Sequence, residues 1–295
     1  MATQMLNLPE ELVTEIFNKV NGHSAIAKLS AQKPLPFNGE KEFVFTMPGE
    51  ASIVAEGAAK PANSDAVITP VVIRPFKFIY QTRITDEFLN AADEARMKYL
   101  QAFGDGFAAK IARALDIAAM HGLNPKDSTA ISDLATKCFD GVITNIVNYV
   151  AASADDNLDA AVQAIVANGM KVTGVAISPT FGSAMAQIKV QGVAQYPEFR
   201  FGGAPEMFAG YKLDMNTTVP IVATGGKADH AIVGDFEGAF RWGYAKNVPL
   251  KVIEYGDPDG SGRDLQQYNE VCLRAEAYIG WGILDKDSFA AVRVP

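Results

Sequence analysis

Cysteine and histidine, on which most metal sites and nucleophilic catalysts depend, are scarce in this sequence. The 295 residues include two cysteines and three histidines. Cys138 and Cys272 stand far apart without a Cys-x-x-Cys spacing, which favours a reducing compartment over a disulfide framework. No two histidines lie four residues apart, so no zinc site is indicated. We therefore expect no catalytic residue, no metal ligand and no cofactor.

The sequence also lacks a basic charge balance and a long hydrophobic run. The formal net charge is −8, whereas a general nucleic-acid-binding surface needs clustered lysine and arginine. No uninterrupted apolar stretch reaches the roughly 20 residues that span a bilayer. The first residues show no signal-peptide pattern. We expect a protein made and used in a cytoplasm, without a membrane partner.

Two stretches approach ligand-binding motifs but lack essential residues. Neither Gly57 nor Gly226 belongs to the glycine spacing of a phosphate-binding loop. Residues 257–262 match the start of a calcium loop, but Tyr268 stands where the bidentate glutamate is required. We interpret this segment as a turn between strands. Because no acid–base or nucleophile constellation is found, a cytosolic enzyme is only a distant alternative.

Among the patterns that are present, the first is a short amphipathic helix within residues 8–30. Leu12, Ile16 and Val20 recur every four residues and share one helical face. Two prolines and an Asn-Gly pair then predict an extended connection. The segment shows no further core pattern, so we expect it to be detached from the main body.

A period of two residues replaces the helical pattern between residues 42 and 84. Apolar side chains alternate along 42–47 and again along 76–84, on either side of the small-residue stretch "SIVAEGAAKPANSDAVI". We predict two strands of one long hairpin with a mostly apolar face. Because Pro70 and Pro75 donate no backbone hydrogen bond, both strands are expected at an edge.

A long helix is predicted next, from Asp86 to His121. Thr85 suits the N-cap, apolar residues recur every three or four positions, and Gly122 suits the residue after the helix. At about 1.5 Å per residue, such a helix is roughly 54 Å long. His121 is expected to be favoured by the helix dipole at this end.

The rest of the chain predicts a small mixed domain followed by a β-rich end. A helix is expected over 157–170. A buried strand over 172–177 precedes Ser178 and Pro179, which suit an N-cap and a first helical position. This βα unit indicates a mixed domain over about 150–228.

The β-rich end predicts an antiparallel sheet. Residues 271–279 alternate between apolar and charged positions, with Cys272 on the charged face, and two candidate partner strands cover 240–244 and 250–255. The long helix is expected to pack on this sheet. The fold class is therefore α+β, with a chain that leaves one domain, builds another and returns.

In their order, these segments resemble the major capsid proteins of tailed bacteriophages with the Hong Kong 97-type fold. "VAEGAAKPANSD" is similar to the tip of that family's E-loop, and "YQTRITDEFLNAA" to the strand that leads into its spine helix. "VTGVAISPTFGSAMAQIK" is similar to its A-domain, and "NEVCLRAEAYIGWGILDKDSFAAVRV" to its closing P-domain sheet. The resemblance implies five segments: N-arm 1–36, E-loop hairpin 37–84, P-domain 85–150, A-domain 151–228 and P-domain again 229–295.

The resemblance implies a structural protein, not an enzyme. Pentamers and hexamers would form an icosahedral shell around double-stranded DNA, which is held without sequence-specific contacts. Portal, scaffolding and decoration proteins are the implied partners, with scaffolding either a separate protein or a removed segment. The location would be the virion capsid, after assembly in a host cytoplasm. An encapsulin-type nanocompartment shell, which packages a cargo enzyme, is the main alternative.

The resemblance also implies inter-subunit contacts of the E-loop. The residues expected there are Glu56, Gly57, Lys60, Pro61, Asp65, Lys77 and Arg83.

Some family members join subunits through a Lys–Asn isopeptide bond, and Lys60 stands at the position of the linking lysine. Gln266 occupies the asparagine position and Leu273 the glutamate position, while Asn269 and Glu270 lie nearby but out of register. A cross-link of Lys60 with Asn269 is therefore not the expectation. We expect contact without covalent chemistry.

Overall fold

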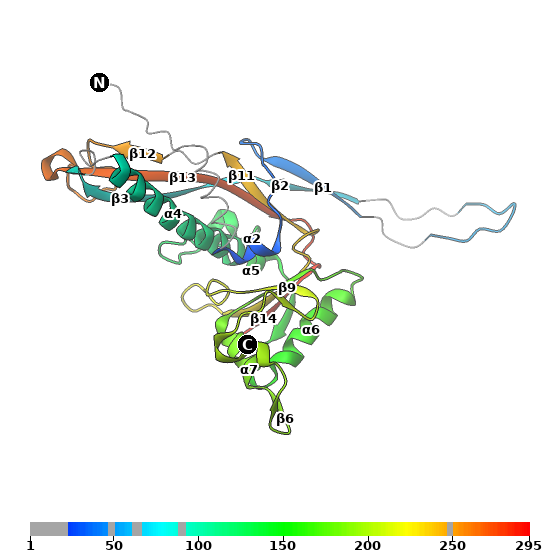
Figure 1. Ribbon diagram of the computed structural model, residues 1–295. Helices are drawn as coiled ribbons and strands as arrows, with labels where there is room; N and C mark the ends of the chain where they lie inside the picture. The colour runs from blue at the N-terminus through cyan, green and yellow to red at the C-terminus, as the bar shows by residue number, and fades with distance from the viewer. Residues whose placement is uncertain (1–22, 47–50, 61–66, 88–92, 247–249) are drawn as a thin grey trace.

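The computed structural model describes residues 23–46, 51–60, 67–87, 93–246 and 250–295. Its two larger β-sheets have helices packed on them, a two-stranded hairpin extends away from both (Figure 1), and β6 and β7 form a second, short hairpin. No described helix is long and apolar enough to span a bilayer. The predicted stripe of Leu12, Ile16 and Val20 lies outside the described residues.

The first sheet is built around one long strand, β13 (Glu270–Ile283). β11 (Phe240–Lys246) and β12 (Leu250–Ile253) pair with one side of it, and β3 (Pro75–Thr85) pairs with the other, all antiparallel. The predicted pairing of the three C-terminal strands is confirmed. We call these four strands the central sheet.

The long helix α4 (Asp93–His121) packs on the central sheet. Leu100, Phe107 and Leu115 of α4 share a buried core with Leu273 and Ala275 of β13. The predicted C-terminal end of the helix is confirmed. Gly122 has φ +66°, and its N–H donates to the carbonyl of Ala118 over 3.0 Å.

The hairpin consists of β1 (Glu40–Thr46) and β2 (Val67–Ile73), paired antiparallel from Glu40 opposite Ile73 to Thr46 opposite Val67. The prediction that the run after Pro75 is its second strand is wrong, because that run is β3 of the central sheet. Alternation alone could not separate these cases, since the strands of both pairs have the same two-residue period. The edge positions are confirmed among the described strands, because β2 pairs only with β1 and β3 only with β13.

The segment from Ser24 onward is part of the core, so the prediction of a detached segment is wrong for these residues. Ser24 caps the five-residue helix α2 (Ala25–Leu29), in which Ile26 and Leu29 are fully buried. Beyond it, the N–H of Lys33 donates to the carbonyl of Trp242 in β11 over 2.9 Å. A helix of five residues is too short to show an apolar stripe in the sequence.

The second sheet has six strands in the order β4-β14-β10-β5-β9-β8. Within it, β4 runs parallel to β14 and β5 parallel to β9, and the other pairs are antiparallel. The strands are β4 (Asn145–Asn148), β5 (Gly174–Ile177), β8 (Met207–Phe208), β9 (Tyr211–Met215), β10 (Asp229–Gly234) and β14 (Phe289–Arg293).

Two helices follow one another along the chain near the strands of the second sheet, and both were predicted as helices, the first with slightly different ends. They are α6 (Ala154–Val166) and α7 (Pro179–Gln187), and the Ser178 hydroxyl accepts from the N–H of Phe181 over 3.1 Å. The assignment of all of 229–295 to the closing sheet is wrong for β10 and β14, which lie beside β5 and β4. The smaller elements are η1 (Ser132–Leu134), α5 (Phe139–Val142), η2 (Ala151–Ser153), β6 (Lys189–Val190), β7 (Val193–Ala194), η3 (Pro197–Gly202) and η4 (Gln266–Tyr268).

Candidate functional site

The hairpin carries large apolar side chains that remain exposed among the described residues. Phe43 is 66% exposed, Phe45 57% and Ile68 57%, and Ile53 near the tip is fully exposed. A two-stranded hairpin is marginally stable in water and requires another surface to lie against. Exposed apolar groups in such number indicate a contact with another molecule.

The base of the hairpin is fixed to the central sheet by ion pairs of one arginine and by apolar contacts. Arg241 of β11 pairs with Glu40 of β1 over 2.9 Å and also with Glu42. Ile73, the last residue of β2, is fully buried, and the ring centroid of Phe37 lies 5.1 Å from that of Tyr278. The hairpin therefore leaves the body in a direction that several contacts determine.

At the tip, the structure exposes three of the predicted contact residues. Glu56, Gly57 and Lys60 lie in the exposed segment 51–60. Gly57 has φ +80°, in a turn where the N–H of Ala58 donates to the carbonyl of Ala55, and a left-handed φ favours glycine. The other two predicted loop residues, Pro61 and Asp65, lie outside the described residues.

Lys77 and Arg83 do not belong to the hairpin, so their placement in the E-loop is wrong. Both lie on β3 and bind acidic residues of the same chain. The ammonium group of Lys77 lies 3.0 Å from Glu276. The Arg83 guanidinium lies 2.6 Å from Asp257 and 3.1 Å from Glu270, and it also pairs with Asp259.

The segment 257–262 is a turn closed by its own hydrogen bonds, as predicted. Asp257 accepts from the N–H groups of Ser261 and Gly262 over 3.0 and 2.7 Å, in addition to its ion pair with Arg83. The carboxylate oxygens that a calcium ion would require are thus already bonded to N–H groups. The turn lies between β12 and β13.

The residues considered for a cross-link with Lys60 have other roles in the fold. Asn269 has φ +49°, and its carbonyl accepts a hydrogen bond from the N–H of Asp86. Leu273 is fully buried in the core. Glu270, the nearest carboxylate in sequence, pairs with Arg83 and Arg263.

Both cysteines are buried, and Cys272 shares the charged face of β13 with Glu270 and Arg274, as predicted. Burial raises the pKa of both thiols. A thiol is a poor nucleophile under these conditions. The charged face of β13 is therefore buried at the position of Cys272.

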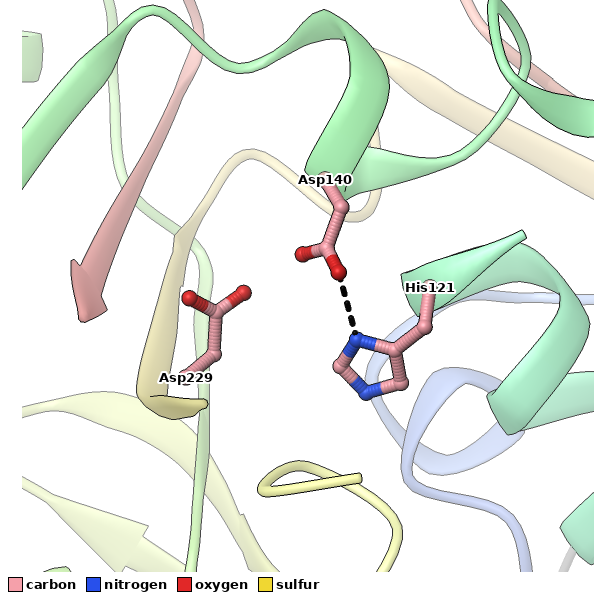
Figure 2. Close-up of side chains that lie close together, drawn as sticks. All are labelled: His121, Asp140 and Asp229. Atoms are coloured by element: carbon pink, nitrogen blue, oxygen red, sulfur yellow. Dashed lines mark hydrogen bonds and ion pairs between the residues drawn. The ribbon is translucent and has the colours of Figure 1, made fainter. Parts of the chain in front are cut away.

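A second polar group gathers at the end of α4, where the sequence predicted only a dipole-favoured histidine. His121 Nδ1 lies 2.9 Å from Asp140 Oδ2, and Nε2 lies 3.0 Å from the carbonyl oxygen of Thr218. Asp229 of β10 points toward the same space (Figure 2). These three side chains come from α4, α5 and β10.

Arg293 of β14 completes this cluster. Its Nε and Nη2 lie 2.5 and 3.0 Å from the two oxygens of Asp229, and Nη2 also lies 2.7 Å from Asp140 Oδ1. Each of the four carboxylate oxygens therefore already faces an N–H group or the imidazole. A divalent ion at this position would have to displace Arg293. We interpret the cluster as an ion-pair joint between the long helix and the second sheet.

The charges in the joint determine its titration. Burial opposes the charge on His121, but the hydrogen bond and charge of Asp140 outweigh this effect and raise the pKa of His121. Burial also opposes the charge on Asp140, but His121 and Arg293 lower the pKa of that carboxyl. Burial, together with the neighbouring Asp140, raises the pKa of Asp229 to about 7.

A buried carboxylate one turn earlier on α4 fixes the N-terminal segment. Asp116 accepts from the hydroxyl of Ser24 over 2.5 Å, from the N–H of Ala25 over 2.9 Å and from the hydroxyl of Thr218 over 3.1 Å. Burial raises the pKa of Asp116 to about 6. The backbone carbonyl of Thr218 accepts a hydrogen bond from His121. Through Thr218, Asp116 and the ion-pair joint therefore form one continuous polar network.

Sequence reasoning missed this network because its members lie up to about two hundred residues apart and share no spacing. The available signal was the occurrence of charged residues in otherwise apolar segments. Asp116 interrupts the apolar end of α4, Asp229 begins a buried strand, and Arg293 ends another. Since a buried charge must be paired, these residues could have been expected to find partners.

Comparisons with known proteins cover nearly the whole chain. A family model described as the phage capsid family matches residues 6–294. A solved structure from Mycobacterium phage Ogopogo is 33% identical with a TM-score of 0.79 and covers 92% of each chain. One from Gordonia phage Cozz is 24% identical with a TM-score of 0.75 and covers 92% of this chain and 87% of that one.

A more distant structure, the capsid of an empty GTA particle, shares the fold. It is 16% identical with a TM-score of 0.64 and covers 92% of this chain and 90% of that one. No curated protein matches the chain.

Proposed function

The chain belongs to the phage capsid family, and from this premise we propose that its β1–β2 hairpin binds a neighbouring copy of the chain in an icosahedral shell. The chain is a structural major capsid protein. The family match and the structural neighbours favour this function over the encapsulin-type alternative. The family match also indicates a structural role and not an enzymatic one.

The observation that carries the hairpin proposal is the contrast between its fixed base and its uncovered apolar face. Arg241 and Ile73 hold the base, whereas Phe43 and Phe45 are more than half exposed. At about 25 cal/mol per Å² of apolar surface removed from water, covering these side chains favours association. A second copy of the chain is the partner available at every hairpin of a shell.

The finer features of the shell are part of the same proposal. We infer hexamers and pentamers, with the second sheet as the A-domain and the central sheet with α4 as the P-domain. The shell encloses double-stranded DNA without sequence-specific contacts. The net charge of −8 is compatible with this mode of enclosure. Portal, scaffolding and decoration proteins are the proposed partners, and assembly takes place in the host cytoplasm.

Deleting residues 55–65 tests the hairpin directly. We expect a folded subunit that assembles poorly, because the deletion shortens the arm and leaves the described cores intact. Sedimentation and electron microscopy measure particle mass, and circular dichroism measures folding. A variant with a Gly/Ser loop of the same length controls for arm length. Normal shells from the deletion variant would rule out the hairpin as a clamp. The shell itself would be contradicted if the unmodified chain remained a monodisperse species of 31.6 kDa under all conditions.

Contact without a covalent bond is the corresponding proposal for Lys60. We expect mature particles boiled in detergent to migrate as single chains on a denaturing gel, because Glu270 is paired with Arg83 and Arg263 and Leu273 supplies no carboxylate. Lys60→Arg, which keeps the charge, should assemble as the unmodified chain does. A ladder of covalent multimers that Lys60→Arg abolishes would show that the lysine is cross-linked.

A further inference from the structure

An open groove of about 820 Å³ runs along β3, between this strand, α4 and the segment 122–134 that follows α4. β3 and α4 lie side by side in the central body (Figure 1). The floor of the groove is apolar and includes Phe78, Ile117, Ile131 and Trp281. The groove is distinct from the hairpin and from the ion-pair joint, which lie elsewhere in the fold.

The rim of the groove carries positive charge only. Lys77, Lys110, Arg113 and Lys126 line it, and none of the described residues that line it is aspartate or glutamate. Glu276 pairs with Lys77. Lys110, Arg113 and Lys126 are exposed, and Arg113 donates to the hydroxyl of Thr217 over 3.2 Å, which leaves its other N–H groups for a ligand. Such a concentration of cations on a chain of net charge −8 favours an acidic ligand.

One wall of the groove is an unpaired strand edge. β3 pairs with β13 on one side, and no other described strand pairs with it. Six consecutive residues, Phe76–Gln81, line the groove, so it follows the strand edge and both faces contribute to it. Ile79 and Tyr80 are 52% and 37% exposed there. An edge of eleven residues offers free N–H and C=O groups to an added strand.

We propose that this groove binds an extended acidic segment of a partner protein, which adds a strand to the edge of β3. Its alternate apolar side chains lie on the floor of the groove, and its carboxylates pair with Lys110, Arg113 and Lys126. Main-chain hydrogen bonds supply affinity in such strand addition, and side-chain pockets supply specificity. This binding goes beyond the shell proposal, because it requires only the isolated subunit.

Two other occupants fit less well. The phosphates of a nucleic acid would pair with the cations of the rim, but a phosphate backbone has no apolar side chains to cover the floor of isoleucine and tryptophan. The β1 strand of a second copy has alternating glutamates, but Glu40 and Glu42 already pair with Arg241. An acidic segment that is not already paired meets both requirements of the groove, charge and apolar contact.

The test measures binding of a fluorescent peptide, (Glu-Val)₄, to isolated subunits by anisotropy. We expect binding that weakens by about tenfold or more in Lys110→Glu/Lys126→Glu, because attraction becomes repulsion. Lys189→Glu/Lys227→Glu makes the same charge change at exposed sites outside the groove and should bind as the unmodified chain does. Hydrogen exchange of β3 amides should slow when the peptide is bound.

Peptide controls separate the contributions. (Lys-Val)₄ should not bind, (Glu-Ser)₄ should bind more weakly, and (Glu-Val)₄ with N-methyl groups on one edge should lose most of its affinity. Equal binding to the groove and control variants, or undiminished binding of the N-methylated peptide, would overturn the proposal, as would the absence of binding. Equal competition by a 20-base-pair DNA duplex would assign the groove to nucleic acid. If the double variant is unfolded by circular dichroism, Lys110→Gln/Lys126→Gln takes its place.

Discussion

At the scale of single residues, Arg293 allows two carboxylates to lie together inside the protein. Asp140 and Asp229 would repel each other without it, and both bond to its guanidinium. His121 adds a second positive charge, because its Nε2 faces a carbonyl that can only accept and its Nδ1 faces Asp140. Both ring nitrogens therefore donate when Asp140 is ionised, and the imidazole is charged.

This charge arrangement predicts a subunit whose stability decreases as the pH rises. The pKa values of Asp116, His121 and Asp229 are all raised in the folded chain. A group whose pKa is raised by folding stabilises the folded chain fully at pH values below its pKa in the unfolded chain. This contribution is lost as the pH rises through its pKa in the folded chain. Asp140, with a lowered pKa, acts in the opposite sense only below about pH 4. We expect the urea midpoint of the isolated subunit to decrease from pH 5 to pH 8.

Two variants divide this pH window. His121→Gln should flatten the profile above about pH 6.5, the ordinary pKa of histidine. Asp116→Asn should flatten it between about pH 4 and pH 6, where the aspartate titrates in the folded chain. If both variants keep the slope of the unmodified chain, the network does not cause the pH dependence.

At the scale of elements, the sequence was most informative where periodicity is long. The C-terminal end of α4 and the alternation of β13 were predicted, because each repeats its pattern over many residues. Strand partners were not, because β3 and β2 have the same alternation and differ only in which strand lies beside them. In the same way, no local pattern distinguishes β14, which joins the second sheet, from a strand of the central sheet.

The attachment of the N-terminal segment to β11 can be tested at one glycine. A Cβ on Gly243 would lie 1.6 Å from the carbonyl oxygen of Lys33, so alanine there must displace the segment or the strand. We expect Gly243→Ala to lower the free energy of unfolding by about 1–3 kcal/mol, the usual cost of overpacking. Urea unfolding measures this change, and faster amide exchange at Lys33 and Leu35 locates it.

Gly106 provides the matched control for this prediction. It lies within α4, and a Cβ there meets nothing within 4 Å. Gly106→Ala should therefore stabilise the chain by about 0.5–1 kcal/mol, because glycine is unfavourable in a helix interior. A loss of stability in Gly106→Ala, or none in Gly243→Ala, would contradict the packing described here.

At the scale of the whole molecule, the hairpin and the two sheets have different requirements. The sheets bury their own cores, whereas the apolar face of the hairpin is left exposed. Folding of the subunit and its assembly can therefore be separated by substitution. Sequence reasoning could foresee the tip of the hairpin from its small residues and glycine, but not the ion pairs at its base, because Arg241 lies about two hundred residues away from Glu40 and Glu42.

Those ion pairs give the last prediction. Arg241→Glu places three acidic groups together at the base of the hairpin, so the arm should leave the body in altered directions while both sheets stay folded. We expect near-normal circular dichroism but fewer shells, with a broader size distribution in electron micrographs. The combined variant Arg241→Glu/Glu40→Arg/Glu42→Arg restores opposite charges with the same strands and should recover uniform shells. Uniform shells from Arg241→Glu alone would mean that the strand register, and not Arg241, determines the direction of the arm. If the combined variant did not recover uniform shells, Arg241 would be needed for a contact other than those with these two glutamates.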